Sequence, residues 1–414
     1  MGFNFPNAPT IGQLHPDPAT VGLPQYQWNG SEWVTPAYNP LDYVRKSGDS
    51  MTGALLLHAN ATAALQAVPK QQLETYAAPL DAMAYSGMQI NGSMEVSQEL
   101  GNTAITVPGY MCDGWFSQKS GTMVLTSQRV AAAYAYGLNY TLAVVVATAS
   151  PALAAGDFAQ VVQIIEGWRI ARLAWGYTAA KPITIAFWSA HARTGLHSIV
   201  VGNADGTRSY AAMYTQAVAN TSQYNVVTIP GCPDGVWNAD NSGGIVIHFA
   251  MAAGTTFTAP TANVWHSTNY VAGPGQVNAV AATADVFRIT GVVVLPGTQA
   301  PTAAQSPLIM RPYGQELLAC QRYFEWCPFS MQFYSFITAE SFECPIRFAV
   351  DKRATPTLSL PVADPNGPGA LFANVAGQSS ALRSTTVGCS IIMTSNTTGS
   401  VYAVGYRFSA DARF

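Results

Sequence analysis

The chain has 414 residues, of which 10 % are charged and 49 % hydrophobic, and its formal net charge is −3. An ordinary soluble domain carries about 25 % charged residues, so this chain has too few for a coiled coil and offers no basic surface to nucleic acid. Its 17 Phe, 19 Tyr and 9 Trp exclude a disordered chain. These numbers favour a β-rich protein with a neutral surface, in about two or three domains.

Residues 1–40 are predicted to form an extended arm that becomes ordered against a partner. Seven prolines remove backbone hydrogen-bond donors too often for a compact sheet or helix. Trp28 and Trp33 flank the Asn29–Gly30 pair, which favours a tight turn. Because two tryptophans in so short a segment need a surface to cover them, we expect Trp28 and Trp33 to anchor the arm.

Residues 41–83 are predicted to form a small unit with one strand and one helix. Met51–Leu57 has the pattern of a short strand, and Pro69 suits the first turn of a helix that carries Leu73 and Tyr76. A unit this small cannot bury a core alone. It must therefore pack against copies of itself or against a neighbour.

Residues 84–300 have the pattern of an all-β domain. Residues 183–188 and 245–249 alternate with period two, which is typical of half-buried strands, and the alternation places Trp188 opposite Phe187. Turn signals such as Asn91–Gly92 recur without helical patterns between them. The domain is predicted to be a jelly-roll β-sandwich.

One uncharged segment, Val130–Gly156, is long enough to cross a bilayer of about 30 Å. Gly137 and Pro151 interrupt it, however, and a proline breaks a helix. We therefore predict buried strands here and no membrane insertion.

Residues 301–414 are predicted to form one helix followed by a C-terminal β-sandwich. Pro312 suits a helix start, and Leu317, Cys320 and Phe324 fall on one helical face. Strand patterns return from Phe329 to Phe414.

Three phrases resemble the tail fibres of tailed bacteriophages and prophages. Tyr43–Leu57 and Leu65–Gln72 are similar to the stalk module of that family, and Glu316–Phe324 is similar to the helix that follows its receptor-binding jelly roll. Residue 72 is Gln where many members have Tyr followed by Val. The resemblance covers most of residues 41–414.

The resemblance implies a mostly β, homotrimeric fibre with four parts. Residues 1–40 would be the virion-anchoring arm, 41–83 the trimerising stalk, 84–300 a carbohydrate-binding-module-like jelly roll, and 301–414 the helix and C-terminal β-domain. The fibre would be made in the host cytoplasm and carried on the virion. Its arm would contact tail, baseplate or neck proteins, and its outer domains would contact bacterial surface polysaccharide.

Glycan binding has a physical rationale in this composition. Sugar rings stack their apolar faces on flat aromatic side chains, and their hydroxyls suit amide and hydroxyl partners. The aromatic candidates for ligand binding in the central domain are Trp168, Trp175, Tyr177, Trp188, Trp237 and Trp265.

No enzyme activity, cofactor or metal is expected. None of the six histidines lies in a nucleophile signature, and acids in the central domain are sparse for the paired carboxylates of a glycosidase. The six cysteines form no CxxC pair, and disulfides and buried thiols both remain open for them. Two alternatives also remain open, a purely structural virion fibre and a surface-polysaccharide depolymerase.

Overall fold

The computed structural model describes residues 4–17, 24–35, 87–131, 137–359, 362–363, 371–373, 383–395 and 398–414. The chain divides into two compact units, Met1–Gln72 and Leu73–Phe414, which are described separately below. The stalk that the sequence predicts at residues 41–83 lies outside the described residues.

The N-terminal unit contains a small antiparallel sheet in place of the extended arm that its prolines predict. Its three strands are β1 (Leu14–His15), β2 (Tyr26–Trp28) and β3 (Trp33–Val34), in the order β1-β2-β3. Proline is compatible with this sheet because each described proline lies outside the strands. Its missing N–H group therefore removes no hydrogen bond between strands. The prediction of an arm without a sheet was wrong for this reason.

The predicted turn between the two tryptophans is confirmed. Trp28 and Trp33 are paired across β2 and β3, and Gly30 has a φ of 106°, which favours glycine. The side-chain oxygen of Asn29 accepts hydrogen bonds from the backbone N–H groups of Ser31 and Glu32. The rings of Trp28 and Trp33 are 5.7 Å apart, and Phe5 stacks on Trp33 at 5.0 Å, so this sheet carries its own aromatic cluster.

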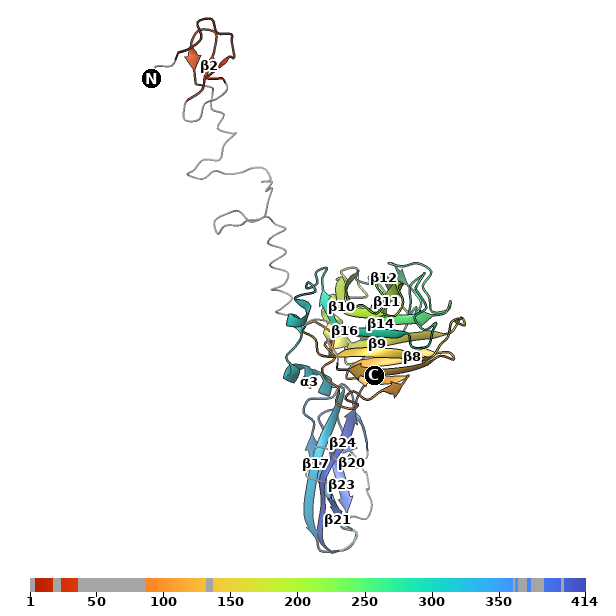
Figure 1. Cartoon of the computed structure of the whole chain (residues 1–414). Coiled ribbons are helices and arrows are strands. Elements are labelled where there is room, and N and C mark those ends of the chain that lie inside the picture. Colours follow the sequence, from red (N-terminus) through yellow and green to blue (C-terminus); the bar gives the residue numbers. More distant parts are fainter. Residues whose placement is uncertain are drawn as a thin grey trace. The chain divides into compact units, whose positions relative to one another are not determined.

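The larger unit begins with two antiparallel sheets, which together form the large sandwich (Figure 1). The first has the order β13-β10-β16-β8-β7-β4 and the second the order β15-β12-β11-β14-β9-β6-β5. The strands of the first sheet are β4 (Ile105–Thr106), β7 (Val124–Val130), β8 (Thr141–Thr148), β10 (Ile183–His191), β13 (Gln223–Ile229) and β16 (Val286–Pro296). Those of the second are β5 (Gly109–Cys112), β6 (Trp115–Ser120), β9 (Phe158–Glu166), β11 (Gly195–Asn203), β12 (Ser209–Gln216), β14 (Gly243–Ala253) and β15 (Trp265–His266).

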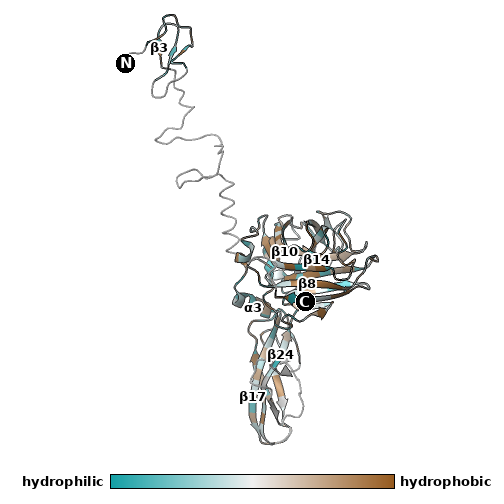
Figure 2. Ribbon diagram, viewed as in Figure 1, coloured by the Kyte–Doolittle hydropathy of each residue, from teal (hydrophilic) through white to brown (hydrophobic). Residues whose placement is uncertain are grey.

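The core of the large sandwich follows the alternation in the sequence. Ile185 and Phe187 from β10 and Ile247 and Phe249 from β14 are fully buried in one cluster between the sheets. Figure 2 shows hydrophobic colours along β8 and β14. The predicted β-sandwich is therefore confirmed.

The uncharged segment that raised the question of a membrane contains strand β8. Its residues Leu142, Val144 and Val146 point into the core. Within the described ranges, none of the helices has the length and apolar character needed to cross a bilayer.

A second, small sandwich follows the large one in the same unit. One sheet joins β17 (Phe324–Ser335), β19 (Thr357–Leu358), β20 (Val362–Ala363) and β21 (Leu371–Ala373) to β24 (Gly399–Asp411), and the other has the order β18 (Ser341–Arg347), β23 (Gly388–Thr394), β22 (Arg383–Ser384). Phe329 and Phe408 from the first sheet and Ile391 from the second share one core. The predicted C-terminal sandwich is confirmed.

Helices are few and short in the described residues. A turn of helix α2 (Gly167–Ile170) and of 3-10 helix η1 (Ala171–Leu173) follow β9, and η2 (Ser306–Ile309) and α3 (Tyr313–Gln321) follow β16. Pro312 is the N-cap residue of α3, one position before the first helical residue at which the sequence predicts it. The helix ends at Gln321, so Phe324 belongs to β17 and not to the helical face on which the spacing placed it. Tyr323 turns the chain between them by donating its backbone N–H to Cys320.

All six cysteines are free thiols in this structure. Cys112 and Cys320 are buried, and desolvation by burial raises the pKa of both thiols well above the ordinary value. These cysteines therefore pack as small apolar residues.

Candidate functional site

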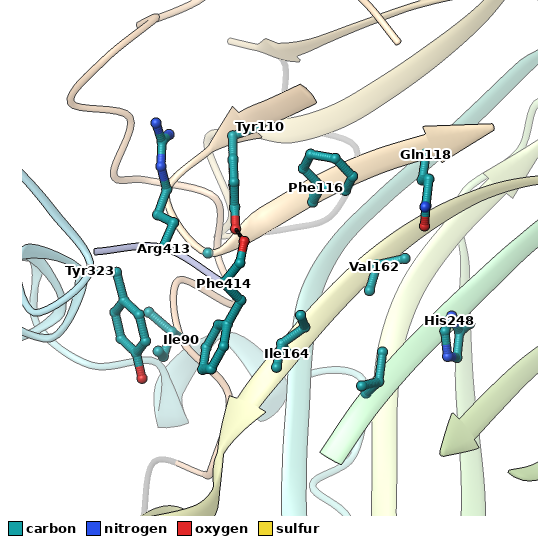
Figure 3. Close-up of a pocket in the computed structure, with 12 residues that line it drawn as sticks. Ile90, Tyr110, Phe116, Gln118, Val162, Ile164, His248, Tyr323, Arg413 and Phe414 are labelled. Atoms are coloured by element: carbon teal, nitrogen blue, oxygen red, sulfur yellow. Dashed lines mark hydrogen bonds between the residues drawn. The ribbon is translucent and has the colours of Figure 1, made fainter. Parts of the chain in front are cut away.

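The outer face of the seven-stranded sheet carries a groove over β6, β9 and β14. Phe116 of β6 is paired with Val162 of β9, and Val162 with His248 of β14, so their side chains stand in one row across the sheet. The pocket in this groove has a volume of about 210 Å³ (Figure 3). It is lined by Ile90, Tyr110, Gly114, Phe116, Gln118, Val162, Ile164, Val246, His248, Tyr323, Arg413 and Phe414.

Only part of this outer face is open. Over β11 and β12, Ala259 packs on Val200 and Ala211, and all three side chains are buried. The hydroxyl of Ser198 donates to the side-chain oxygen of Gln276, which fixes the same covering segment to β11. The groove is thus the part of the sheet that this segment leaves uncovered.

A row of neutral polar groups crosses the groove beside the apolar ones. Gln160 Nε2 donates to Gln118 Oε1 at 3.1 Å, and Gln160 Oε1 lies 2.9 Å from Nδ1 of His248. Because an amide oxygen can only accept, Nδ1 of His248 carries the proton. The other ring nitrogen, Nε2, is then a hydrogen-bond acceptor, while the exposed Gln118 retains its amide donors.

The charge state of His248 follows from its burial. The side chain is 8 % exposed, and desolvation lowers its pKa from 6.5 to about 4. The imidazole is therefore neutral at neutral pH. The hydrogen-bonding groups from Gln118 to His248 carry no charge.

One end of the groove is closed by residues that come from beyond the large sandwich. Tyr323 and Phe414 lie against each other with ring centres 5.8 Å apart, and the hydroxyl of Tyr110 donates to the backbone oxygen of Phe414 at 3.1 Å (Figure 3). The guanidinium of Arg353 lies 4.0 Å over the ring of Phe414. The wall of the groove is therefore fixed by the small sandwich.

Arg413 lines this end of the groove, and its charge is compensated. Its guanidinium contacts the carboxylates of Asp411 and Glu99, each at 2.6 Å. It also lies over the rings of Tyr110 and Phe324. Two carboxylates on one guanidinium leave no net positive charge to attract an acidic ligand.

Glu166 fixes the junction between the two sandwiches. Its carboxylate accepts hydrogen bonds from the guanidinium of Arg322, with Nε at 2.8 Å, and from the hydroxyl of Tyr323 at 2.8 Å. The carboxylate is buried and fully used in these contacts. Its position beside Trp168 at the end of β9 thus serves the packing of the small sandwich.

Three of the predicted ligand-binding tryptophans meet in one cluster. Trp175 lies 4.6 Å from Trp237 and 5.5 Å from Trp265, between ring centres, and the latter two are 5.7 Å apart. Trp175 is buried, and all three indole N–H groups donate to backbone oxygens. The cluster lies at the β15 edge of the seven-stranded sheet, outside the groove lining.

The other predicted residues are dispersed. Trp188 stands on the outer face of the six-stranded sheet, where its Nε1 donates to the hydroxyl of Ser306 at 3.1 Å and its ring contacts Tyr224. Trp168 in α2 is 63 % exposed and Tyr177 is 70 % exposed. Trp28 and Trp33 belong to the N-terminal unit. The role of all eight predicted residues remains a prediction.

The groove residues were not singled out by their sequence. The alternation in residues 245–249 separates His248 from the buried Ile247 and Phe249, which was the one available signal. Phe116, Gln160 and His248 lie far apart in the chain, and only the strand register brings them together.

Comparisons with known proteins show distant similarity only. No protein-family model and no curated protein matches the sequence. Among solved structures, the enzymatically active domain of tailspike protein 4 of bacteriophage CBA120 matches 44 % of this chain and 19 % of its own length, at 15 % identity and a TM-score of 0.27.

Two carbohydrate-binding modules match over most of their own length. A CBM4 module covers 50 % of this chain and 97 % of itself, at 15 % identity and a TM-score of 0.26. The module TmCBM61, solved with β-1,4-galactotriose, covers 44 % of this chain and 88 % of itself, at 11 % identity and a TM-score of 0.23. At TM-scores this low the matches carry no argument about the function of this chain.

Proposed function

We propose that the large sandwich binds a neutral glycan in the groove over β6, β9 and β14. The observation that carries this proposal is the row of uncharged hydrogen-bonding groups, Gln118, Gln160 and His248, beside the apolar side chains of Phe116 and Val162. An apolar lining with a few convergent polar groups is the usual make-up of a ligand pocket. A sugar ring would rest on the apolar groups while its hydroxyls donate to Nε2 of His248 and accept from Gln118.

We further propose that the protein is a homotrimeric phage tail fibre, carried on the virion, that attaches the particle to bacterial surface polysaccharide. The support is the resemblance of Tyr43–Leu57, Leu65–Gln72 and Glu316–Phe324 to that family. Three linked copies would raise the effective concentration of each weak site. The proposed attachment requires no reaction, and the described residues that line the groove include no Asp or Glu.

Glycan binding can be tested with the full chain on an array of neutral and acidic bacterial oligosaccharides. We expect neutral glycans to bind, and Phe116→Ala and Gln118→Ala to weaken binding at least about tenfold, which is about 1.4 kcal/mol. Tyr334→Ala is the matched control, because this exposed ring lies on β17 of the small sandwich, outside the groove lining. Loss of binding in the control alone would place the site elsewhere.

The fibre assignment needs a second measurement. Light scattering on the full chain should give three times the mass of one chain, 43.9 kDa. A monomer would contradict the trimer. A trimer found on virions that binds no glycan would favour the purely structural fibre, and release of oligosaccharides from host polysaccharide would favour the depolymerase.

A further inference from the structure

A second cavity lies at one end of the large sandwich, where loop 93–102 meets the end of β7 and the start of α3. Its volume is about 410 Å³. It is lined by Glu95, Ser97, Gln98, Arg129, Asn139, Tyr140 and Tyr313, none of which lines the groove.

Arg129 is the basic group of this cavity and is held rigidly. Its Nε donates to the side-chain oxygen of Asn102 at 2.9 Å, and its Nη1 donates to the backbone oxygen of Glu95 at 2.6 Å. The guanidinium carbon lies 4.1 Å from the centre of the Tyr140 ring. These contacts fix the guanidinium plane before any ligand arrives.

The charge of Arg129 is uncompensated within the described part of the chain. The residue is only 9 % exposed, and no ion pair of the described residues includes it. Its remaining N–H groups, including both on Nη2, have no acceptor among those residues. A buried charge without a partner is costly, so an anion that enters the cavity would gain a strong, oriented contact.

The rest of the lining suits hydroxyl groups. The hydroxyl oxygen of Ser97 is buried and has no hydrogen-bond partner among the described residues. Asn139 is exposed at the cavity, and the ring of Tyr313 is 57 % exposed. Glu95 also lines the cavity, and burial raises the pKa of its carboxyl group.

We propose that this cavity is a second binding site, for a small hydroxylated anion. A carboxylate or phosphate group binds the Arg129 guanidinium, whose planar array of N–H donors matches the oxygens of such groups. The hydroxyls of the same ligand reach Ser97 and Asn139. The chemistry is shared by sugar acids and by polyol phosphates. The site stands apart from the groove, so it holds whether or not the groove binds a glycan.

The test is isothermal titration calorimetry of the full chain with D-glucuronate, glycerol phosphate and D-glucose. We expect saturable binding of at least one of the two anions and no binding of glucose. The anion that binds shows whether the ligand is a sugar acid or a polyol phosphate. No binding of either anion, or equal binding of glucose, would overturn the proposal.

Variants localise the binding. Arg129→Gln should weaken anion binding at least about tenfold, whereas the same change at the exposed Arg172 should leave it unchanged. Because Arg129→Gln removes two internal hydrogen bonds and can harm folding, Asn139→Leu serves as the second variant. The side chain of this exposed residue donates no hydrogen bond to another described residue, and its change should weaken D-glucuronate binding about threefold. Unaltered binding in both Asn139→Leu and a folded Arg129→Gln would show that the anion binds elsewhere.

Discussion

The two outer faces of the large sandwich differ in what covers them. On the six-stranded sheet, Ser306 accepts the indole hydrogen bond of Trp188, and Ile309 packs on Val293 and Leu295. On the seven-stranded sheet, the row from Phe116 to His248 is left open. The six-stranded sheet thus has its outward aromatic side chain covered by a later segment of the chain. The seven-stranded sheet leaves a row of apolar and polar side chains uncovered.

In a β-rich sequence, an aromatic residue on the outward side of a strand does not by itself indicate an exposed surface. A tryptophan on the outward phase of a strand can be covered by a later segment of the chain, as Trp188 is. An open face can instead consist of residues as ordinary as valine and glutamine. Three experiments test whether the two faces differ in this way.

The first change is Trp188→Ala on the covered face. Loss of the half-buried indole and of its hydrogen bond to Ser306 should lower the free energy of unfolding by about 3 kcal/mol, measured by urea titration. Glycan binding should not change. Val226→Ala, an exposed position on the neighbouring β13, is the control and should stay within about 0.5 kcal/mol. A stable Trp188→Ala protein that has lost glycan binding would reverse the roles of the two faces.

The second change is acidification, which acts on the open face through His248. Its folded-state pKa of about 4 lies below the unfolded value of 6.5, so the unfolded state binds the proton first. The contribution of His248 to the free energy of unfolding is fully present above pH 6.5 and is lost as the pH drops. Between pH 6.5 and 5 this residue alone lowers the free energy of unfolding by about 2 kcal/mol.

Two further histidines act in the same direction. His191 and His197 are stacked 3.5 Å apart inside the sandwich, and burial lowers the pKa of both. Buried Asp113 and half-buried Glu95 have raised pKa values, so their protonation favours the folded state and opposes the loss. Urea titrations across this range should show a shallower pH slope for His248→Gln than for the wild type. Equal slopes for wild type and His248→Gln would contradict the neutral imidazole.

The third change is Phe414→Ala at the end of the groove. Because the ring is 37 % exposed, its removal should cost only about 1 kcal/mol of unfolding free energy. Glycan affinity should fall, since the wall it forms with Tyr323 is lost. Unchanged affinity with a measurable loss of stability would show that this wall serves packing alone.

The sequence predicted the strands and helices of the fold better than the tertiary contacts between them. Alternation identified the strands around Phe187 and Phe249 and the buried phase of each, because period two is a local property. Pro312 marked the start of α3 for a similarly local reason. The proline-rich N-terminal segment led to a wrong prediction, because the number of prolines does not show whether they lie within strands or between them.

The candidate site could not be predicted in the same way. The contact of Gln118 with Gln160 depends on the register of β6 against β9, and residue 118 and residue 160 are separated by two other strands in the chain. Phe414 reaches the groove only after the small sandwich has formed. The cover over Trp188 also comes from a segment more than a hundred residues away.

The contact of Arg353 with Phe414 has a mechanical consequence. The end wall of the groove belongs to the small sandwich, so pulling the two sandwiches apart would open the groove at that end. A molecule bound across this wall would oppose the separation with its own binding free energy. Tension applied to the small sandwich would then be resisted most when the groove is occupied.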